Sequence, residues 1–316
     1  MKKILLFLGM LFTFTNVQAM TLDNEGNYLN EVGAIIRVSE YEVLSSIFNE
    51  STIKYLPQES VNYYINNIDN LEFDKKILLT TNKIDKNGVI LETNEAIIDE
   101  NEINMYKNND NYVVLSDNKI YDISNQCLNT RSTEEEWRYS TEMKMIQMTY
   151  NAINYGAAYE IIVEVEWFDE PLIKQYDVLA VRWDESVSKS NVLDYIATQT
   201  AKDSSGDYLD SQDYFLDGTN MKRTTYGIGQ SMNLFNSGHT FEMSMRMDLE
   251  SDVGDVVYAT YQHARHSSAN TLAISKSYTF SNSGLGNVLY YSNSTYRNYY
   301  DGMQGVRCHL GTKHID

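Results

Sequence analysis

Two glutamates, Glu164 and Glu166, stand two positions apart in a segment where apolar and acidic residues alternate. On a β-strand both side chains would point to the same face, at a separation of about 6–7 Å. Two carboxylates at such a separation resemble the acid and base of a glycosidase. Such pairs usually come from different strands that meet in a cleft, however, so the pattern favours an exposed acidic face over a hydrolytic site.

His263 and His266 are the only closely spaced histidines in the chain. A zinc site needs both imidazoles on one side together with further ligands, but positions three apart on a strand point to opposite faces. No Cys, Asp or Glu beside them in the sequence supplies a third ligand. We therefore predict that they lie in a turn or at the end of a sheet and hold no metal.

Aspartates crowd a stretch that also contains serine and glycine. They are Asp203, Asp207, Asp210, Asp213 and Asp217. Oxygen-rich loops can bind calcium in extracellular proteins, but the spacing is not that of an EF-hand. The favoured interpretation is a solvated acidic loop between strands. We predict no cofactor and keep calcium as the alternative.

Tyrosines gather near the C-terminus, at Tyr290, Tyr291, Tyr296, Tyr299 and Tyr300. Tyrosine joins an apolar ring to a polar hydroxyl, so exposed tyrosines can stack on sugars or contact proteins. The alternative is that they are strand residues half buried in a core. These five residues are the candidate ligand contacts.

The sequence lacks the recognised catalytic motifs. It has no Gly-X-Ser-X-Gly nucleophile elbow, no phosphate-binding glycine loop and no His-Glu-X-X-His zinc helix. Neither of the two cysteines has the local signature of a nucleophile. The sequence therefore supplies no catalytic residue and favours a protein that is not an enzyme.

Cys127 and Cys308 are the two cysteines of the chain. In an oxidising compartment two lone cysteines are usually paired, and we predict a disulfide between them. The loop that it closes covers most of the C-terminal half, for which chain-entropy arithmetic gives an upper figure of about 5 kcal/mol. The alternative is two unrelated buried thiols.

Residues 1–19 have the three parts of a secretory signal peptide. Lys2 and Lys3 carry positive charge, residues 4–14 are an apolar run, and Val17-Gln18-Ala19 resembles a cleavage site. No later stretch reaches the about 18 uninterrupted apolar residues of a transmembrane helix. We expect a secreted protein, extracellular or in the cell envelope.

The formal net charge of the chain is −19 at pH 7. Binding to nucleic acid needs a basic stripe, and none is visible, so a nucleic-acid partner is not expected. Anionic membrane surfaces are disfavoured for the same reason. The charge suits a soluble extracellular protein whose self-repulsion opposes aggregation.

Residues 20–124 are predicted to form a small α+β unit. Ser39 and Glu42 resemble a capping box at the start of a helix, and a second helix is expected to start at Pro57. Two hairpins follow, the first turning at Lys86-Asn87-Gly88 and the second joining residues 112–115 to 120–121. The polar segment 125–136 is the expected linker.

Residues 137–316 are predicted to form an antiparallel β-domain. Period-two alternation is clearest in residues 159–167 and 240–249, and it predicts strands with one buried and one solvent-facing side. Further strands are expected at residues 176–183, 221–235, 256–261, 271–280 and 288–291. The fold class is therefore mainly β, an antiparallel β-sandwich-like C-terminal domain behind an α+β N-terminal unit.

The segment from Tyr159 to Trp167, followed by Pro171 and Tyr176-Asp177-Val178, resembles a pattern in uncharacterised secreted proteins of Gram-positive bacteria. The upstream segment Tyr55-Leu56-Pro57-Gln58-Glu59 is similar in layout. Lys174-Gln175 stand where that pattern has an arginine. The resemblance implies export and β-structure, and it supplies no activity.

Several functions fit these observations, and the leading one is non-catalytic binding of an extracellular surface protein or glycan. The second is a β-pore-forming toxin, because residues 221–235 and 240–249 could refold into membrane-crossing strands. The third is a secreted hydrolase, which a deep pocket holding a carboxylate of raised pKa would support. The N-terminal unit could also mask the β-domain.

Overall fold

The computed structural model describes residues 20–85, 90–103, 112–115, 119–122, 137–153, 158–183, 191–250, 256–281, 288–301 and 305–311. Within these ranges the chain is mainly β, as predicted. The expected signal peptide, residues 1–19, and the expected linker, residues 125–136, lie outside them.

A seven-stranded sheet forms the larger layer, and all of its strands pair antiparallel. Its order is β12 (Tyr208–Phe215), β11 (Asn191–Lys202), β15 (Thr240–Glu250), β9 (Ala158–Trp167), β8 (Trp137–Ile153), β4 (Asp74–Asp85) and β5 (Ile90–Ile98). The two clearest alternating segments of the sequence therefore become the neighbouring strands β9 and β15.

A five-stranded antiparallel sheet forms the second layer. Its order is β13 (Met221–Thr224), β14 (Gly227–Asn233), β10 (Tyr176–Trp183), β16 (Val256–Gln262) and β19 (Val306–His309). The sequence predicted one strand over residues 221–235, whereas the chain turns at residues 225–226 and pairs β13 with β14.

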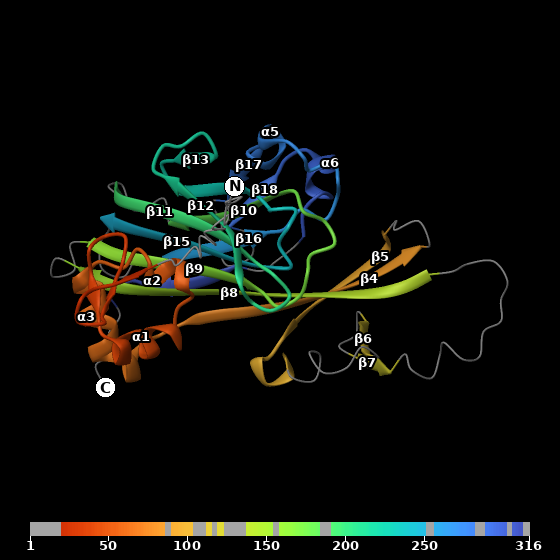
Figure 1. The fold of residues 1–316 in the computed structure, drawn as a ribbon. Coiled ribbons are helices and arrows are strands. Elements are labelled where there is room, and N and C mark those ends of the chain that lie inside the picture. The colour runs from red at the N-terminus through yellow and green to blue at the C-terminus, as the bar shows by residue number, and fades with distance from the viewer. Residues whose placement is uncertain are drawn as a thin grey trace, which may run out of the picture.

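The main core lies between the two sheets (Figure 1), where apolar side chains of both layers are buried together. Val163 and Met245 of the larger sheet meet Leu179 and Ala259 of the smaller one in this cluster, all of them without exposed surface. The arrangement is the sandwich that period-two strands produce when each sheet buries one face against the other.

The N-terminal segment folds into a small sheet followed by short helices. The sheet contains β1 (Thr21–Leu22), β2 (Tyr28–Leu29) and β3 (Ile35–Ile36), and the helices are α1 (Val38–Ser45), α2 (Glu50–Ile53), α3 (Gln58–Asn67) and η1 (Ile68–Asn70).

The predicted capping box of the first helix was wrong by two residues. The N–H of Arg37 donates to the carboxylate of Glu40 at 2.9 Å, which places the start of α1 at Val38, ahead of the expected Ser39 cap. Helix α3 follows Pro57 directly, and Pro57 is the residue before the first helical position.

Helices α1–α3 cover the outer face of the seven-stranded sheet (Figure 1), and their apolar side chains form a cluster with Ile162 of β9. The prediction that the acidic side of β9 faces solvent is therefore wrong, because Glu160 and Glu164 are buried, with exposed fractions of 0 % and 2 %. The alternation was correctly recognised, but a second layer of side chains replaces water on the polar face.

The opposite outer face, on the five-stranded sheet, carries α5 (Leu272–Ser275), β17 (Tyr278–Phe280), β18 (Leu289–Tyr291) and α6 (Ser294–Arg297). The predicted strand over residues 271–280 was wrong in its first half, because the side chain of Thr271 caps a helical turn by accepting from the N–H of Ile274. Tyr278 packs so closely on β14 that a Cβ at Gly229 would overlap its hydroxyl.

Both predicted hairpins are present as strand pairs, although their turns, residues 86–89 and 116–118, lie outside the described residues. Strand β4 pairs with β5, and β6 (Tyr112–Leu115) pairs with β7 (Lys119–Asp122). On its other side β4 pairs with β8 along its whole length. The ends of β4, β5 and β8 extend beyond the five-stranded sheet (Figure 1), and η2 (Glu100–Glu102) follows β5.

Candidate functional site

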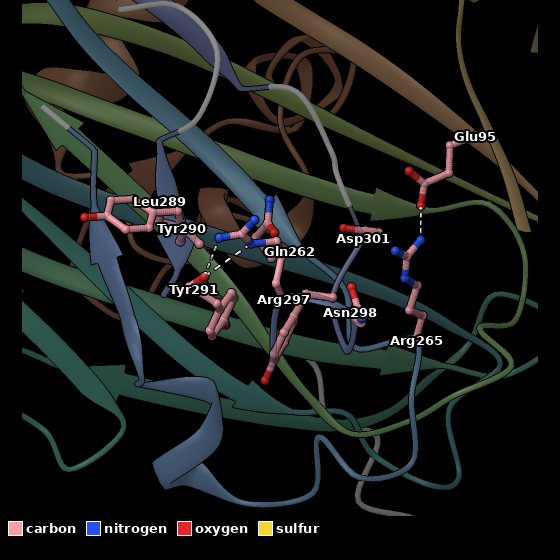
Figure 2. A pocket seen from close by; sticks show the side chains of 10 residues that line it. Glu95, Gln262, Arg265, Leu289, Tyr290, Tyr291, Arg297, Asn298 and Asp301 are labelled. Atoms are coloured by element: carbon pink, nitrogen blue, oxygen red, sulfur yellow. Dashed lines mark hydrogen bonds and ion pairs between the residues drawn. The ribbon is translucent and has the colours of Figure 1, made fainter. Parts of the chain in front are cut away.

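A pocket of about 490 Å³ opens where β16, β18 and α6 meet a side chain from β5 (Figure 2). It is lined by Glu95, Gln262, Arg265, Leu289, Tyr290, Tyr291, Arg297, Asn298, Tyr300 and Asp301. We call it the tyrosine pocket. Its walls therefore combine aromatic rings with amides, guanidinium groups and carboxylates.

Short-range capping shapes one wall of the tyrosine pocket. The side chain of Asn293 accepts from the N–H groups of Thr295 and Tyr296, which starts α6 one residue later. The turn of α6 then returns the chain to the segment that follows β16, where Tyr300 pairs with Ala264 in an isolated bridge. The bridge thereby brings the residues after α6 beside those at the end of β16, and both segments line the tyrosine pocket.

Both arginines of the tyrosine pocket are held in place by acceptors on the protein. Arg265 contacts Glu95 at 3.0 Å, and Arg297 donates from Nε and Nη2 to the carbonyl of Tyr291, both at 3.3 Å. Figure 2 shows the Arg265–Glu95 pair on one side of the pocket and Tyr290 with Leu289 on the other. A guanidinium fixed in this way loses less side-chain entropy when a ligand binds.

The structure brings three of the five candidate tyrosines to the tyrosine pocket. Tyr290 is 43 % exposed, whereas Tyr291 and Tyr300 are almost fully buried and stack at 4.5 Å between ring centroids. Burial raises the pKa of both buried hydroxyls above the ordinary value, so they stay neutral. Only Tyr290 offers a large exposed ring to a ligand.

Tyr296 and Tyr299 do not line the tyrosine pocket. Their rings lie 5.9 Å apart and pack half-buried against the cluster beneath, and His266 stacks on Tyr299 at 4.7 Å. Whether any of the five tyrosines contacts a ligand stays a prediction.

A buried polar cluster adjoins the tyrosine pocket, since His263 follows the lining residue Gln262 and donates from its N–H to the lining residue Asp301. Nδ1 of His263 is 3.0 Å from Oδ2 of Asp177, which also accepts from the Tyr261 hydroxyl. Trp167 donates from Nε1 to the same hydroxyl at 3.0 Å, and its ring packs against that of His263. The sequence placed His263 at a sheet end, but gave no signal for Asp177, because the two residues are far apart in the chain.

A second cavity, of about 290 Å³, lies under the turn between α1 and α2. Its lining includes Glu164, Glu166 and Glu242. Oε1 of Glu164 accepts from the N–H of Asn49 and the hydroxyl of Thr52, and Oε2 accepts from Gln147. Burial nevertheless raises the pKa of Glu164 to about 7.

The aspartate stretch does not converge on one point. Asp203 accepts from the N–H groups of Ser205 and Asp207 and so caps the turn between β11 and β12, whereas Asp213 pairs with Lys54 and Tyr55 of the N-terminal segment. Among the described residues no group of three or more His, Cys, Asp or Glu side chains has the arrangement of a metal site.

Cys308 lies on β19 with its thiol buried, and Sγ donates to the carbonyl of Met148 at 3.7 Å. Burial raises the pKa of this thiol to about 12. Cys127 lies outside the described residues, so the Cys127–Cys308 disulfide stays a prediction.

Comparison with known proteins yields no sequence relative, since no family model and no curated protein matches the chain. Among solved structures, the C-terminal domain of the Streptococcus agalactiae AgI/II polypeptide BspA aligns at 8 % identity and a TM-score of 0.23, over 60 % of this chain and 79 % of that one. The enzymatically active domain of bacteriophage CBA120 tailspike protein 4 aligns at 14 % identity and a TM-score of 0.22, over 39 % of this chain.

The chain spans only 15 % of the tailspike chain that it matches. At these TM-scores both likenesses are distant structural resemblances, and neither places the chain in a family. In the described part of the chain, no helix is long and apolar enough to cross a membrane.

Proposed function

We propose that this chain is an exported, non-catalytic binding protein and that its tyrosine pocket holds a neutral glycan. The signal-peptide pattern of residues 1–19 supports export. A concave site with an aromatic wall and a few fixed polar groups is the usual form of a small-ligand site.

The observation that carries the proposal is the exposed ring of Tyr290 beside fixed hydrogen-bonding groups. A sugar presents a face of C–H groups, which packs on an aromatic ring, and a rim of hydroxyls, which needs donors and acceptors. Gln262 and Asn298, which line the pocket together with Arg297, each supply an amide that can donate and accept hydrogen bonds. The pocket therefore offers both halves of what a sugar requires.

The charges of the tyrosine pocket favour a neutral ligand. Arg265 is paired with Glu95 and Asp301 with Lys144, so Arg297, which donates to the carbonyl of Tyr291, is the remaining charge among the lining residues. A pocket whose charges are mostly paired gives little electrostatic preference to a strongly anionic or cationic ligand. This balance supports a neutral glycan over a charged peptide segment.

The test is a binding screen with purified protein on an array of cell-surface glycans, followed by calorimetry on the best glycan. Tyr290→Ala should weaken binding about tenfold or more, equivalent to about 1.4 kcal/mol, because the stacking surface is lost. Tyr226→Ala is the matched control, since Tyr226 is 38 % exposed on the β13–β14 turn and does not line the pocket. Equal affinity of the Tyr290 variant and the wild type, or no bound glycan, would refute the proposal.

A secreted hydrolase is the second candidate, favoured by the raised pKa of Glu164 at the wall of the second cavity. Both carboxylate oxygens of Glu164 already accept hydrogen bonds from the protein, and Oε1 of the neighbouring Glu242 contacts Lys202. A general acid must reach its substrate, so these carboxylates suit an anchoring role better. New reducing ends released from the glycan bound in the screen would reverse this ranking.

A further inference from the structure

Lys144 on β8 and Asp301, which follows α6, are in direct contact in the interior. Their side chains are only 3 % and 2 % exposed. In four other lysine–carboxylate pairs of the described ranges, the lysine side chain is 15 % exposed or more. The Lys144–Asp301 pair, with both side chains removed from water, therefore differs from these four.

Aromatic rings enclose the Lys144 amine. Nζ lies 4.8 Å from the ring centroid of Trp167 and 5.8 Å from that of Tyr261. These two rings are themselves linked by the hydrogen bond from Trp167 Nε1 to the Tyr261 hydroxyl. The rings keep water from the contact, which would otherwise favour the separated ions and hydrolyse an activated carboxyl group.

The carboxyl group of Asp301 is held from both sides. Its Oδ1 accepts from the N–H of His263 at 3.0 Å, its backbone N–H donates to the carbonyl of His263 at 3.0 Å, and its Oδ2 contacts Nζ of Lys144. The carbon that a nucleophile would attack is thus fixed beside the amine. Such fixed proximity can replace a large part of the barrier of a bimolecular reaction.

Transferring two charges from water to the interior carries a desolvation cost that their mutual attraction offsets only in part. A covalent amide between the two groups has no charge. We propose that Lys144 and Asp301 join in an intramolecular isopeptide bond, which makes this contact a self-modification site of the chain.

The reaction balances without any further reagent. One proton passes from the Lys144 ammonium to the Asp301 carboxylate, the Nζ lone pair attacks Cγ, and the tetrahedral intermediate loses one hydroxyl of Asp301 together with a proton from Nζ. The Nζ–Cγ bond forms, one C–O bond breaks, and one water molecule leaves. The N–H of His263 on Oδ1 stabilises the oxyanion as it develops.

Asp177 acts as a positioning residue for this contact. Its carboxylate accepts from the Tyr261 hydroxyl and from the N–H of Ala264, and it lies 3.0 Å from Nδ1 of His263. It thereby fixes the strand end whose N–H holds Asp301 and the ring that encloses Lys144. Asp177→Asn should therefore slow bond formation in a time course read by mass spectrometry, while Lys144 and Asp301 remain unchanged in sequence.

The bond would tie β8 of the seven-stranded sheet to the segment that leads into β19 of the five-stranded sheet, 157 residues later in the chain. A cross-link over so long a loop stabilises the fold chiefly by restricting the unfolded chain. Unlike a disulfide, it resists reduction. This inference is independent of the ligand of the tyrosine pocket.

The test is peptide mapping of the full wild-type chain after denaturation, reduction and proteolysis. We expect a branched peptide that joins the Lys144 and Asp301 segments and weighs one water molecule less than the two segments together. Recovery of both segments as separate, unmodified peptides would show an ordinary buried ion pair and overturn the proposal.

Variants test whether Lys144 and Asp301 are the two residues that the bond joins. Lys144→Arg and Asp301→Ala should each abolish the branched peptide, and the control Lys54→Met, which removes the half-buried pair with Asp213, should keep it. A branched peptide that persists in Lys144→Arg would overturn the assignment to Lys144. Because the bond itself is detected in the wild-type chain, a variant that fails to fold leaves the outcome of the peptide mapping unchanged.

Discussion

Glu164 makes stability depend on pH, because burial outweighs its hydrogen bonds. Three groups donate to its carboxylate and favour the charged form, yet desolvation raises the pKa from 4.5 to about 7. In the unfolded chain the group loses its proton near pH 4.5, whereas in the folded chain it keeps it until about pH 7. Unfolding within this window therefore releases a proton, so the free energy of unfolding falls as pH rises.

The predicted loss from Glu164 between pH 4.5 and 7 is about 3 kcal/mol. Urea unfolding of the wild type at pH 5 and pH 8 should show the higher midpoint at pH 5. Glu164→Gln should remove most of this difference. Burial also raises the pKa of Asp248 to about 6. Asp248 therefore contributes in the same direction and accounts for the midpoint difference that remains in the variant. A midpoint difference that is unchanged in the variant would contradict the assignment to Glu164.

At the scale of single residues, the sequence identifies some of the side chains that line the pocket, but not the residues that surround them. Tyr290, Tyr291 and Tyr300 could be picked out because tyrosines cluster in the sequence. Glu95 and Gln262, on the same pocket, come from other parts of the chain and carry no local signal. The contact of His263 with Asp177 is equally invisible in one sequence, because it depends on how β10 pairs with β16.

At the scale of elements, helix α3 is docked on the sheet through one buried carboxylate. Glu160 of β9 accepts from Ser60 at 2.9 Å and from Tyr64 at 3.0 Å, both on α3. On its other side Oε1 accepts from Nε of Arg246 on β15 at 2.7 Å. The buried carboxylate of Glu160 therefore links helix α3 to strands β9 and β15.

Arg246→Met should lower the free energy of unfolding by about 3–5 kcal/mol, because Glu160 is left as a buried charge without a cation. Adding Glu160→Gln should recover much of that loss, since the unpaired charge is then gone. Urea unfolding of the two variants measures this. Arg223→Met is the control, because its pair with Asp217 is exposed and is worth at most about 1 kcal/mol. A double variant no more stable than Arg246→Met would refute the account.

Strands β9 and β15 could be predicted because period-two alternation is a local property of the sequence. The burial of their polar face could not, since a glutamate facing water and one facing Ser60 or Thr52 of a covering helix look the same in the sequence. The strand predicted over residues 271–280 was wrong in its first half for another local reason. The side chain of Thr271 caps α5, and this cap outweighed the strand propensity of the residues around it.

At the scale of the whole molecule, the N-terminal segment is joined to the rest by a sheet as well as by helices. Strand β4 pairs with β8 from Asp74 to Asp85. The helices α1–α3 cover β9, where Ile162 joins their apolar cluster, and Ser51 of α2 contacts Ser244 of β15. The sequence suggested a division at residues 125–136, and whether residues 20–124 can fold alone stays a prediction. The observed pairing instead places strands from both parts of the chain in one sheet. At the β4–β8 junction neither part ends in a free edge strand, because the two strands hydrogen-bond to each other.

Cutting the backbone within residues 130–135, through an inserted protease site, should therefore leave one folded complex. Under reducing conditions, which remove any Cys127–Cys308 link, the two fragments should co-elute in native gel filtration. They should separate only in denaturant, because separation would expose both the β4–β8 edge strands and the apolar cluster around Ile162. Two fragments that elute apart, each with its own cooperative unfolding transition, would show instead that the N-terminal segment is an independent unit able to leave the β-domain.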